Sequence, residues 1–418
     1  MKILHLNYSD TQGGAARAVA RIHQSQLDVG IDSHLHVQQK QNDTNENICG
    51  PSFLDFIYHR LRAQVSRLLV KSLNTQNPIR HSPAIFPSLW PSKINKSDFD
   101  IVNLHWVANE MLSISDVAKI KKPIVWNAHD MWLFCGAEHV TEDTRWVDGY
   151  RLDNRPSGEM GFDLNRWTWQ RKRKIFGDKE INFIAPSQWI ARCIKSSPLF
   201  HNPKVNVIPN CLDTSFWHPV DQHEARRFLG LPLGVPLIGF GTFHSNHYDF
   251  KGFGELKKTL ELLSKQYSDL ELVVFGQKKG PERIANFKVN YVGYISDDNI
   301  LKQIYGAVDL IVMPSRIEAF GQVASEAQSC GKPVVAFRTG GLSDIIEHRK
   351  TGYLAEPFYP EDLLEGIKWI LEQLDVINNH AVADASLGSY ARERAISQYS
   401  YNVCAKDYFE LYSKILTG

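Results

Sequence analysis

The sequence predicts an α/β protein with parallel sheets, because short β-rich runs alternate with helical stretches along most of its 418 residues. Many of these runs are continuously apolar, which is typical of strands that helices cover on both faces. Prolines and glycines gather between Pro209 and Pro236, as they do in linkers, and they separate one series of strands from another. We therefore expect two domains, residues 1–212 and 213–399, followed by a helical pattern at 400–418.

The first series begins at the N-terminus, where the apolar run is too short for a signal peptide and reads as a strand. The expected strands of this series are Lys2–Asn7, His34–Gln38, Asp100–His105, Pro123–Ala128, Asn182–Ala185 and Lys204–Ile208. The expected strands of the second series are Pro236–Gly241, Leu270–Gly276, Asn290–Gly293, Asp309–Met313, Pro333–Phe337 and Gly352–Ala355.

Composition limits the kinds of partner. Hydrophobic residues make up 43% of the chain and charged residues 22%, as in an ordinary globular protein. The formal net charge of +1 gives no general attraction to nucleic acid, so we expect no nucleic-acid partner. The six cysteines include no C-x-x-C pair, which disfavours a zinc site or a disulfide framework and fits a reducing cytosol. No apolar run is long enough to cross a bilayer, so any membrane contact should be peripheral.

One segment is a candidate for such peripheral contact. Residues 56–73 carry Arg60, Arg62, Arg67 and Lys71 among leucine, isoleucine and valine. This pattern predicts either a basic amphipathic helix on a membrane surface or a helix with one buried stripe and one solvated face.

The most informative segment runs from Glu318 to Glu326, where two carboxylates bracket a glycine-containing turn and a helical pattern begins. It follows the apolar run Val308–Met313, so it lies at the carboxyl end of a predicted strand. Open α/β sheets bind ligands at that end, and a helix N-terminus offers N–H groups to a phosphate. Two glutamates on a surface helix would have the same spacing, so the surrounding sequence must decide between the two interpretations.

That surrounding sequence is distinctive. From Pro314 to Leu354 the chain continues through Ser-Cys-Gly-Lys-Pro, a strand and Thr339-Gly-Gly, and it resembles the donor-binding half of a retaining GT-B glycosyltransferase with the E-x7-E motif. The resemblance is to the family 4-like type of bacterial polysaccharide biosynthesis. It implies a GT-B fold, with two Rossmann-like domains, a cleft between them that closes on the donor, and a C-terminal helix packed back on the N-terminal domain.

The resemblance also implies an activity. A sugar would move from a UDP- or GDP-linked donor to a glycan or lipid-linked glycan acceptor, with retention of anomeric configuration and without a metal or cofactor. The enzyme would act in the cytoplasm or at the inner face of the cytoplasmic membrane. Two alternatives are a nucleotide-sugar epimerase or hydrolase, and a scaffold that binds nucleotide sugars without catalysis.

Residue roles follow from the same resemblance. Glu326 would hold the ribose, Glu318 the donor sugar, and Lys251 would stabilise the diphosphate as a point charge. The catalytic residues expected are His129, Lys251 and Glu318. The donor-binding residues expected are Gly13, Gly14, Thr242, Lys251, Tyr294, Ile295, Glu318, Ala319, Phe320, Gly321, Gln322 and Glu326.

Two of these positions lie in the N-terminal half. Gly13 and Gly14 follow the first strand and open a helix, where small residues let the backbone approach an anion; they could equally form only a tight turn. His129 ends a strand on the ligand side and would contact the donor sugar, although it could merely form a hydrogen bond to Asp130 or to the backbone. We favour a site role for both. His129 and His139 lack the spacing that would aim both at one metal ion.

One part of the expected phosphate site is missing. Many relatives pair the lysine with an arginine shortly after the preceding strand, but residues 239–244 contain none. Thr242, His244 or Arg316 would have to take its place. This gap is the one feature that favours the scaffold.

Overall fold

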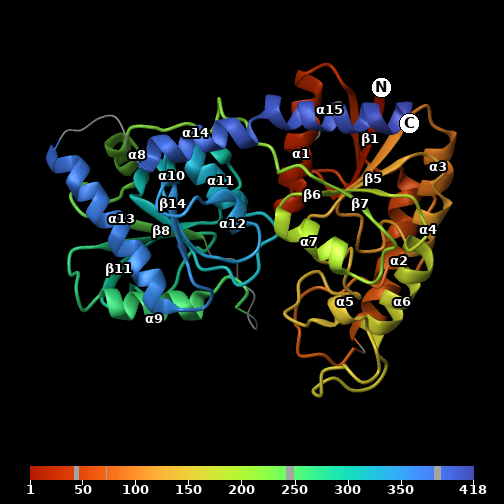
Figure 1. Cartoon of the computed structure of the whole chain (residues 1–418), viewed down its shortest axis with the longest axis horizontal. Coiled ribbons are helices and arrows are strands. Elements are labelled where there is room, and N and C mark those ends of the chain that lie inside the picture. The colour runs from red at the N-terminus through yellow and green to blue at the C-terminus, as the bar shows by residue number, and fades with distance from the viewer. Residues whose placement is uncertain (42–46, 72, 242–248, 381–386) are drawn as a thin grey trace. The chain divides into compact units, whose positions relative to one another are not determined.

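The computed structural model describes residues 1–41, 47–71, 73–241, 249–380 and 387–418. The chain divides into two compact units, Met1–Cys211 together with Tyr401–Gly418, and Leu212–Ser400. The sequence placed the division one residue later, after residue 212. Each unit contains a mainly parallel sheet flanked by helices, so the predicted α/β class is confirmed (Figure 1).

The first unit is built on a sheet in which every described strand pair is parallel. Its strands are β1 (Lys2–Ser9), β2 (Asp32–Gln39), β3 (Ile48–Cys49), β4 (Ile101–Leu104), β5 (Ile124–Asn127), β6 (Asn182–Ala185) and β7 (Lys204–Val207). Their spatial order is β3-β2-β1-β4-β5-β6-β7. All strands predicted for this half are present. The sequence analysis missed β3, which is only two residues long and carries no alternating pattern.

Helices cover both faces of this sheet. They are α1 (Gly13–Asp28), α2 (Phe53–Lys71), α3 (Trp90–Lys96), α4 (Ile114–Lys119), α5 (Arg145–Asp148), α6 (Leu164–Phe176), α7 (Gln188–Ser196) and α15 (Tyr401–Thr417). Helices α1 and α15 share one buried cluster with the strands, in which Ile22 and Tyr408 meet Val125. Successive strand residues face opposite sides, so the next residue, Trp126, packs instead against Phe176 of α6, with ring centroids 5.4 Å apart.

The second unit repeats this arrangement around its own sheet. Its strands are β8 (Leu237–Gly241), β9 (Glu271–Phe275), β10 (Arg283–Ile284), β11 (Phe287–Gly293), β12 (Leu310–Met313), β13 (Val334–Phe337) and β14 (Gly352–Ala355). Their order is β10-β11-β9-β8-β12-β13-β14, and among the described pairs only β10 with β11 is antiparallel. The sequence analysis found each of these strands except the two-residue β10.

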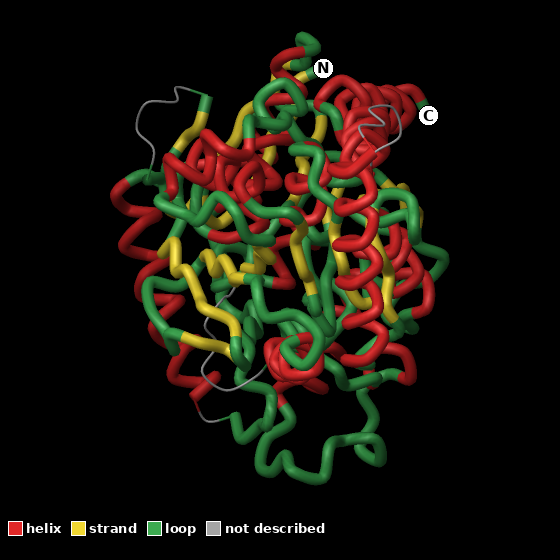
Figure 2. Tube along the Cα trace, turned by 90° about the vertical axis from the view of Figure 1, so that its left-hand side faces the viewer, coloured by secondary structure: helices red, strands yellow, loops and turns green. Residues whose placement is uncertain are grey.

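The helices of the second unit form two layers. They are α8 (Gln222–Leu229), α9 (Phe253–Leu263), α10 (Asp298–Ala307), α11 (Gln322–Ser329), α12 (Leu342–Ile345), α13 (Pro360–His380) and α14 (Leu387–Tyr399). Alternate residues of β12 pack against different helix layers. Leu310 and Val312 pack with α9 and α13, whereas Ile311 and Met313 pack with α8, α10, α11, α12 and α14. Figure 2 shows the strands of the chain in yellow and its helices in red.

In each sheet the order of strands reverses at one point. The strands that follow β1 in sequence lie first on one side of it and then, from β4 onward, on the other. The same reversal occurs between β8 and β12 in the second sheet. In open α/β sheets the crevice outside the carboxyl ends of the strands at such a reversal is the usual ligand site. The fold therefore marks one candidate location in each unit.

Helix α2 has an unusual orientation in the first unit. Its buried side is largely polar: Arg62 donates to the carbonyl oxygen of Phe86 at 2.8 Å, and Ser66 donates to Glu110 at 2.8 Å. Its large apolar side chains face outward instead, with Leu54 75% and Leu68 66% exposed. Within the described residues, none of the helices combines the length and the apolar character that a membrane crossing requires.

Candidate functional site

The strand reversal in the second unit brings together two of the predicted catalytic residues. Lys251 lies just before α9, which follows β8, and Glu318 lies in the loop between β12 and α11. Their side chains form an ion pair, with Nζ of Lys251 2.6 Å from Oε2 of Glu318. The lysine side chain is 47% exposed and the glutamate 18%, so the ammonium group remains open to an incoming anion.

Glycines allow these loops to approach each other. Gly252 has a φ of +70°, and a Cβ on it would lie 1.8 Å from the carbonyl oxygen of Pro314 at the end of β12. Gly340 has a φ of +53°, and a Cβ there would lie 2.1 Å from the carbonyl oxygen of Glu318. Neither position can hold a side chain without moving the backbone. The Lys251–Gly and Thr339–Gly–Gly sequences thus fix the loops around Glu318.

The segment after Glu318 leads into helix α11. Gly321 caps this helix with a φ of +109°, and a Cβ on it would lie 2.8 Å from Leu342. Phe320 is buried and packs edge-on against Tyr399, with ring centroids 5.6 Å apart, while Ala319 and Gln322 are half-buried. The N-terminus of α11 therefore starts beside the Lys251–Glu318 pair. Backbone N–H groups at such a terminus favour an anion.

Glu326 lies deeper than the sequence suggested. It is in α11 and only 1% exposed, and its Oε2 accepts a hydrogen bond of 2.8 Å from the hydroxyl of Tyr305 in α10. Tyr305 itself is fully buried. A buried carboxylate requires hydrogen-bond donors, and this contact fixes the direction in which Glu326 points.

The other residues predicted to bind the donor in this unit differ in exposure and in whether the structure describes them. Tyr294 and Ile295 follow β11 at the same carboxyl edge, and Tyr294 is 64% exposed whereas Ile295 packs against the core. Thr242 and His244 lie outside the described residues. Arg316 contacts Glu255, with Nη1 2.6 Å from the carboxylate, and lies over the ring of Phe358 at 4.2 Å.

In the first unit, Gly13 and Gly14 form an exposed turn at the start of α1. Gly13 has a φ of +87° and open space where a Cβ would be, so backbone conformation rather than crowding explains this glycine. Ser9, the last residue of β1, accepts hydrogen bonds from the backbone N–H groups of Thr11 and Gln12, which shapes the turn.

His129 follows β5 and is half-buried at the carboxyl edge of the first sheet. Its Nε2 lies 2.8 Å from Nδ1 of His105, which follows β4, and the two rings stack. Burial lowers the pKa of His129 to about 4, although neighbouring Asp130 acts in the opposite direction. Both histidines line a cavity of about 20 Å³. That volume holds about one water molecule.

Asp130 does not bond to His129 as the alternative reading proposed. Its Oδ2 lies 2.6 Å from Nδ1 of His139, whose Nε2 lies 2.8 Å from Oγ of Ser82. This arrangement matches the geometry of a serine nucleophile with its base, but Ser82 is only 3% exposed and a substrate cannot reach it. The contacts instead fix the loop after His129. Across the described residues, His, Cys, Asp and Glu side chains do not gather in a group of three that could hold a metal ion.

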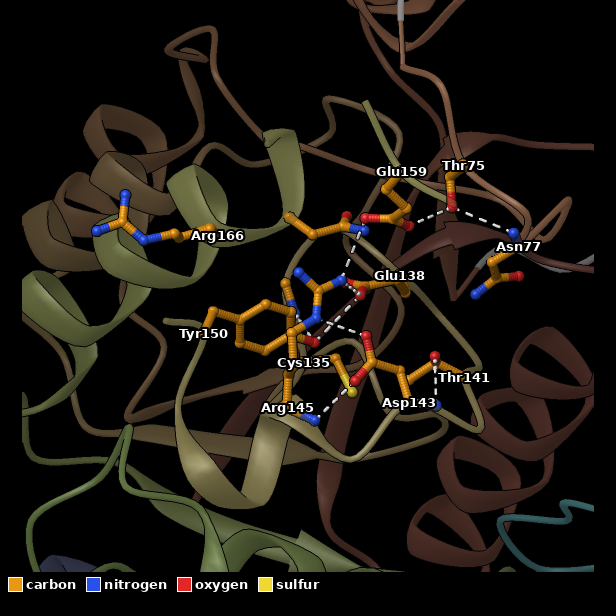
Figure 3. Close-up of polar contacts among 12 residues, drawn as sticks. Thr75, Asn77, Cys135, Glu138, Thr141, Asp143, Arg145, Tyr150, Glu159 and Arg166 are labelled. Atoms are coloured by element: carbon orange, nitrogen blue, oxygen red, sulfur yellow. Dashed lines mark hydrogen bonds and ion pairs between the residues drawn. The ribbon is translucent and has the colours of Figure 1, made fainter. Parts of the chain in front are cut away.

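The same loop is held further along by buried ion pairs. Arg145 of α5 is 2.5 Å from Asp143 and 3.4 Å from Glu159 (Figure 3). It is also 3.3 Å from Asp163. Tyr150 accepts a hydrogen bond from the backbone N–H of Gly136, so two ends of the loop are tied together. Partners surround each charge, as burial requires. These contacts hold the loop that follows His129 in a fixed conformation.

Sequence reasoning missed several supporting residues. Asp249 lies three residues before Gly252, the N-cap of α9, and accepts hydrogen bonds from the backbone N–H groups of Phe253 and Gly254 at 2.8 and 2.5 Å. An aspartate shortly before a helix is a recognisable sequence signal for contacts of this kind. Tyr305 and His105 had no such local signal, because their partners Glu326 and His129 are 21 and 24 residues away.

Two family models match the chain. The model described as Glycosyltransferase Family 4 matches residues 12–216, and the model described as Glycosyl transferases group 1 matches residues 242–393. Among curated relatives, the D-inositol 3-phosphate glycosyltransferase of Pseudarthrobacter chlorophenolicus is 29% identical over 48% of this chain and 50% of its own length. The chain spans about half the length of the relatives of this kind that it matches.

Other similarities extend over the whole chain. The putative colanic acid biosynthesis glycosyl transferase WcaC of Escherichia coli is 24% identical over 99% of this chain and all of its own length. Among solved structures, sucrose-phosphate synthase from Thermosynechococcus elongatus has a TM-score of 0.67 at 16% identity, over 99% of this chain and 98% of its own. HepE from Anabaena in complex with UDP-glucose has a TM-score of 0.66 at 19% identity, over 99% and 100%. These structures share the fold.

Proposed function

Because the chain belongs to the GT-B glycosyltransferases, with a family 4 domain followed by a group 1 domain, we propose that it transfers a sugar from a nucleotide-diphosphate donor to a glycan or lipid-linked acceptor in cell-surface polysaccharide synthesis. The observation that carries this proposal is the Lys251–Glu318 pair beside the N-terminus of α11, at the strand reversal of the second sheet. The ammonium group of Lys251 and the backbone N–H groups at the start of α11 lie close together, and both kinds of group bind the oxygen atoms of a diphosphate.

The donor half of the reaction follows from these groups. Lys251 stabilises the charge that develops on the leaving diphosphate as the glycosidic bond breaks, without a metal ion. When the diphosphate binds Lys251, the ion pair with Glu318 breaks, and Glu318 accepts hydrogen bonds from the hydroxyls of the donor sugar. Glu326, held by Tyr305, accepts hydrogen bonds from the ribose. The Lys251–Glu318 ion pair thus holds two charged groups beside the N-terminus of α11, where the diphosphate would bind.

The nucleotide and the stereochemistry belong to the same proposal. We favour UDP over GDP, since HepE was solved with UDP and with UDP-glucose. Transfer proceeds with retention, the sugar hydroxyl of the acceptor attacking from the face that the diphosphate leaves. His129 contacts the transferred sugar and helps to align the acceptor.

A first experiment separates this function from its alternatives. Nucleotide sugars are screened by thermal shift, because a ligand of the folded state raises the melting temperature by mass action. The donor that binds is then incubated with and without glycan acceptors, in the presence and absence of EDTA, and the products are analysed by NMR. Transfer with retained configuration in EDTA supports the proposal. Conversion of the donor without an acceptor indicates an epimerase or hydrolase.

The scaffold alternative is favoured by the absence of an arginine from residues 239–244. Arg316, a candidate for the missing phosphate-clamp arginine, forms an ion pair with Glu255. Binding of a nucleotide sugar by the wild-type protein without any turnover would support the scaffold and contradict the enzyme.

We further propose that α2 attaches the protein to the inner face of the cytoplasmic membrane. Its outward side carries Phe53, Leu54, Leu61 and Leu68, each more than half exposed, with Arg67 among them. Exposed apolar side chains interspersed with cations match an anionic lipid surface. Arg62, which the sequence analysis counted with these cations, is buried and does not contribute.

A further inference from the structure

A row of hydrogen bonds leads from His129 into the interior of the first unit. Nε2 of His129 lies 2.8 Å from Nδ1 of His105, and Nε2 of His105 lies 2.9 Å from Nδ1 of His5 in β1. Nε2 of His5 in turn lies 2.9 Å from Oε1 of Gln26 in α1. His5 and Gln26 are fully buried, and His105 is 3% exposed. We call these residues the histidine row.

The inner end of the histidine row is anchored by helix α15. The amide nitrogen of Gln26 donates to the hydroxyl of Tyr412 at 3.1 Å, and Asn103 donates to the same hydroxyl at 2.6 Å. With its nitrogen directed at Tyr412, Gln26 presents its oxygen to His5. A carbonyl oxygen can only accept a hydrogen bond. This contact therefore sets the direction of every bond in the row.

Each ring in the row is neutral. Burial lowers the pKa of His5 to about 3 and that of His105 well below its ordinary value. A neutral imidazole has one nitrogen that donates and one that accepts. Because Gln26 accepts from Nε2 of His5, Nδ1 of His5 must accept from Nε2 of His105. By the same rule Nδ1 of His105 accepts from Nε2 of His129.

We propose that His105, His5 and Gln26 are positioning residues that hold His129 in the tautomer with its proton on Nε2 and its lone pair on Nδ1. This inference rests on the proposed function, in which His129 contacts a sugar. The opposite tautomer would present an N–H group. His129 thus acts as a hydrogen-bond acceptor and selects a sugar hydroxyl, which can donate.

The tautomer can be measured directly in the full chain. The protein is labelled with ¹⁵N-histidine, and the ring signals of His129 are assigned by their loss in His129→Asn. We expect Nε2 to carry the proton at pH 7.5 while Nδ1 is unprotonated. A proton on Nδ1, or on both nitrogens, would overturn the proposal. This measurement needs no donor, so it stands apart from the test of transferase activity.

A variant tests whether the histidine row causes this state. Gln26→Leu removes the terminal acceptor, and we expect a mixture of His129 tautomers with kcat about tenfold lower, the equivalent of one hydrogen bond. The KM for the donor should stay within about twofold, because the change acts on alignment rather than donor binding. Ser25→Ala, at a buried neighbour outside the row, should change neither property.

The outcomes are distinct. An unchanged His129 tautomer in Gln26→Leu would overturn the role of the histidine row even if the wild-type enzyme transfers sugar. If the wild-type chain turns over none of the nucleotide sugars, the proposed function fails, and the tautomer of His129 still decides whether the row positions it. Should Gln26→Leu not fold, the wild-type spectrum alone decides.

Discussion

Lys251 and Glu318 form an ion pair at 2.6 Å although 67 residues separate them in the chain. Gly252 and Gly340 make this contact possible, because each lies where a side chain would strike the backbone of a neighbouring loop. The pair is partly exposed, and such ion pairs contribute only about 0–1 kcal/mol to stability. We therefore expect the pair to matter for catalysis rather than for stability, and a substitution can separate its effect on turnover from its effect on the melting temperature.

Lys251→Ala should abolish most transfer while leaving the fold intact. Loss of one preorganised group that stabilises developing charge typically lowers kcat about a hundredfold or more. The melting temperature should change little. The control is Lys350→Ala, which removes a lysine paired with Glu347 at 3.1 Å on the surface of the same unit. Equal activity of the two variants would remove Lys251 from the mechanism.

Glu326→Gln should weaken binding of the donor, because the amide keeps the shape of the side chain but loses the charge that accepts from ribose hydroxyls. Hydrogen bonds to charged groups contribute about 1.5–3 kcal/mol, so we expect affinity to fall at least about tenfold. Nucleotide-induced thermal shifts report this loss. Tyr305→Phe, which removes the donor that fixes Glu326, should produce a smaller loss in the same assay. Unchanged nucleotide binding in Glu326→Gln would exclude the ribose role.

The sequence predicted the long strands and the loops at their carboxyl ends because both depend on local patterns. The alternation of β-rich and helical stretches gave the α/β class, and continuous apolar runs such as that before Glu318 gave the strands. The two-residue strands β3 and β10 have no such pattern, so they were missed.

Partners distant in the chain were also beyond sequence reasoning. His105 was counted as the last residue of a strand, and nothing near it indicates a bond to His5, 100 residues away. The polar inward side of α2 is a similar case. The sequence predicts that Arg62 is a surface cation, and only the structure shows that it donates to the carbonyl oxygen of Phe86. Tertiary contacts decide both.

His129→Ala should lower turnover more than donor binding. The nucleotide contacts proposed above lie in the second unit, whereas His129 serves alignment of the sugar and acceptor. We expect kcat to fall about tenfold or more and the nucleotide-induced thermal shift to stay near that of the wild type. His201→Ala, at an exposed histidine of the first unit, provides the comparison. Wild-type turnover in His129→Ala would leave this histidine a structural role only.

The outward side of α2 should determine membrane attachment. Phe53→Ser combined with Leu54→Ser removes two side chains that are about three-quarters exposed, so the fold should survive. Binding to vesicles of phosphatidylglycerol and phosphatidylcholine should fall about tenfold or more, since transfer of these side chains into the lipid interface is lost. Phe228→Ser, at a residue 67% exposed in the second unit, is the matched control. Comparable vesicle binding by all three proteins would contradict the attachment.

The buried histidines should make the first unit sensitive to mild acid. Burial lowers the pKa of His5 to about 3, and that of His23 and His81 to about 4, from an ordinary value near 6.5. Between those values the unfolded chain binds more protons than the folded one. Stability is therefore fully present above about pH 6.5 and is lost as the pH falls toward 4, by at most about 1.4 kcal/mol per pH unit for each such group.

Urea denaturation at pH 7.5, 6.5 and 5.5 measures this loss. Unfolding of the first unit is monitored by tryptophan fluorescence, in a variant that lacks the two tryptophans of the second unit, Trp217 and Trp369. His81→Asn should be less stable than the wild type at pH 7.5 but lose less stability on acidification, because it removes one of the protons taken up on unfolding. His223→Asn, at an exposed position of α8, should retain the wild-type pH dependence. A wild-type midpoint that stays constant from pH 7.5 to 5.5 would show that these histidines do not become protonated on unfolding, which would contradict their burial as neutral rings.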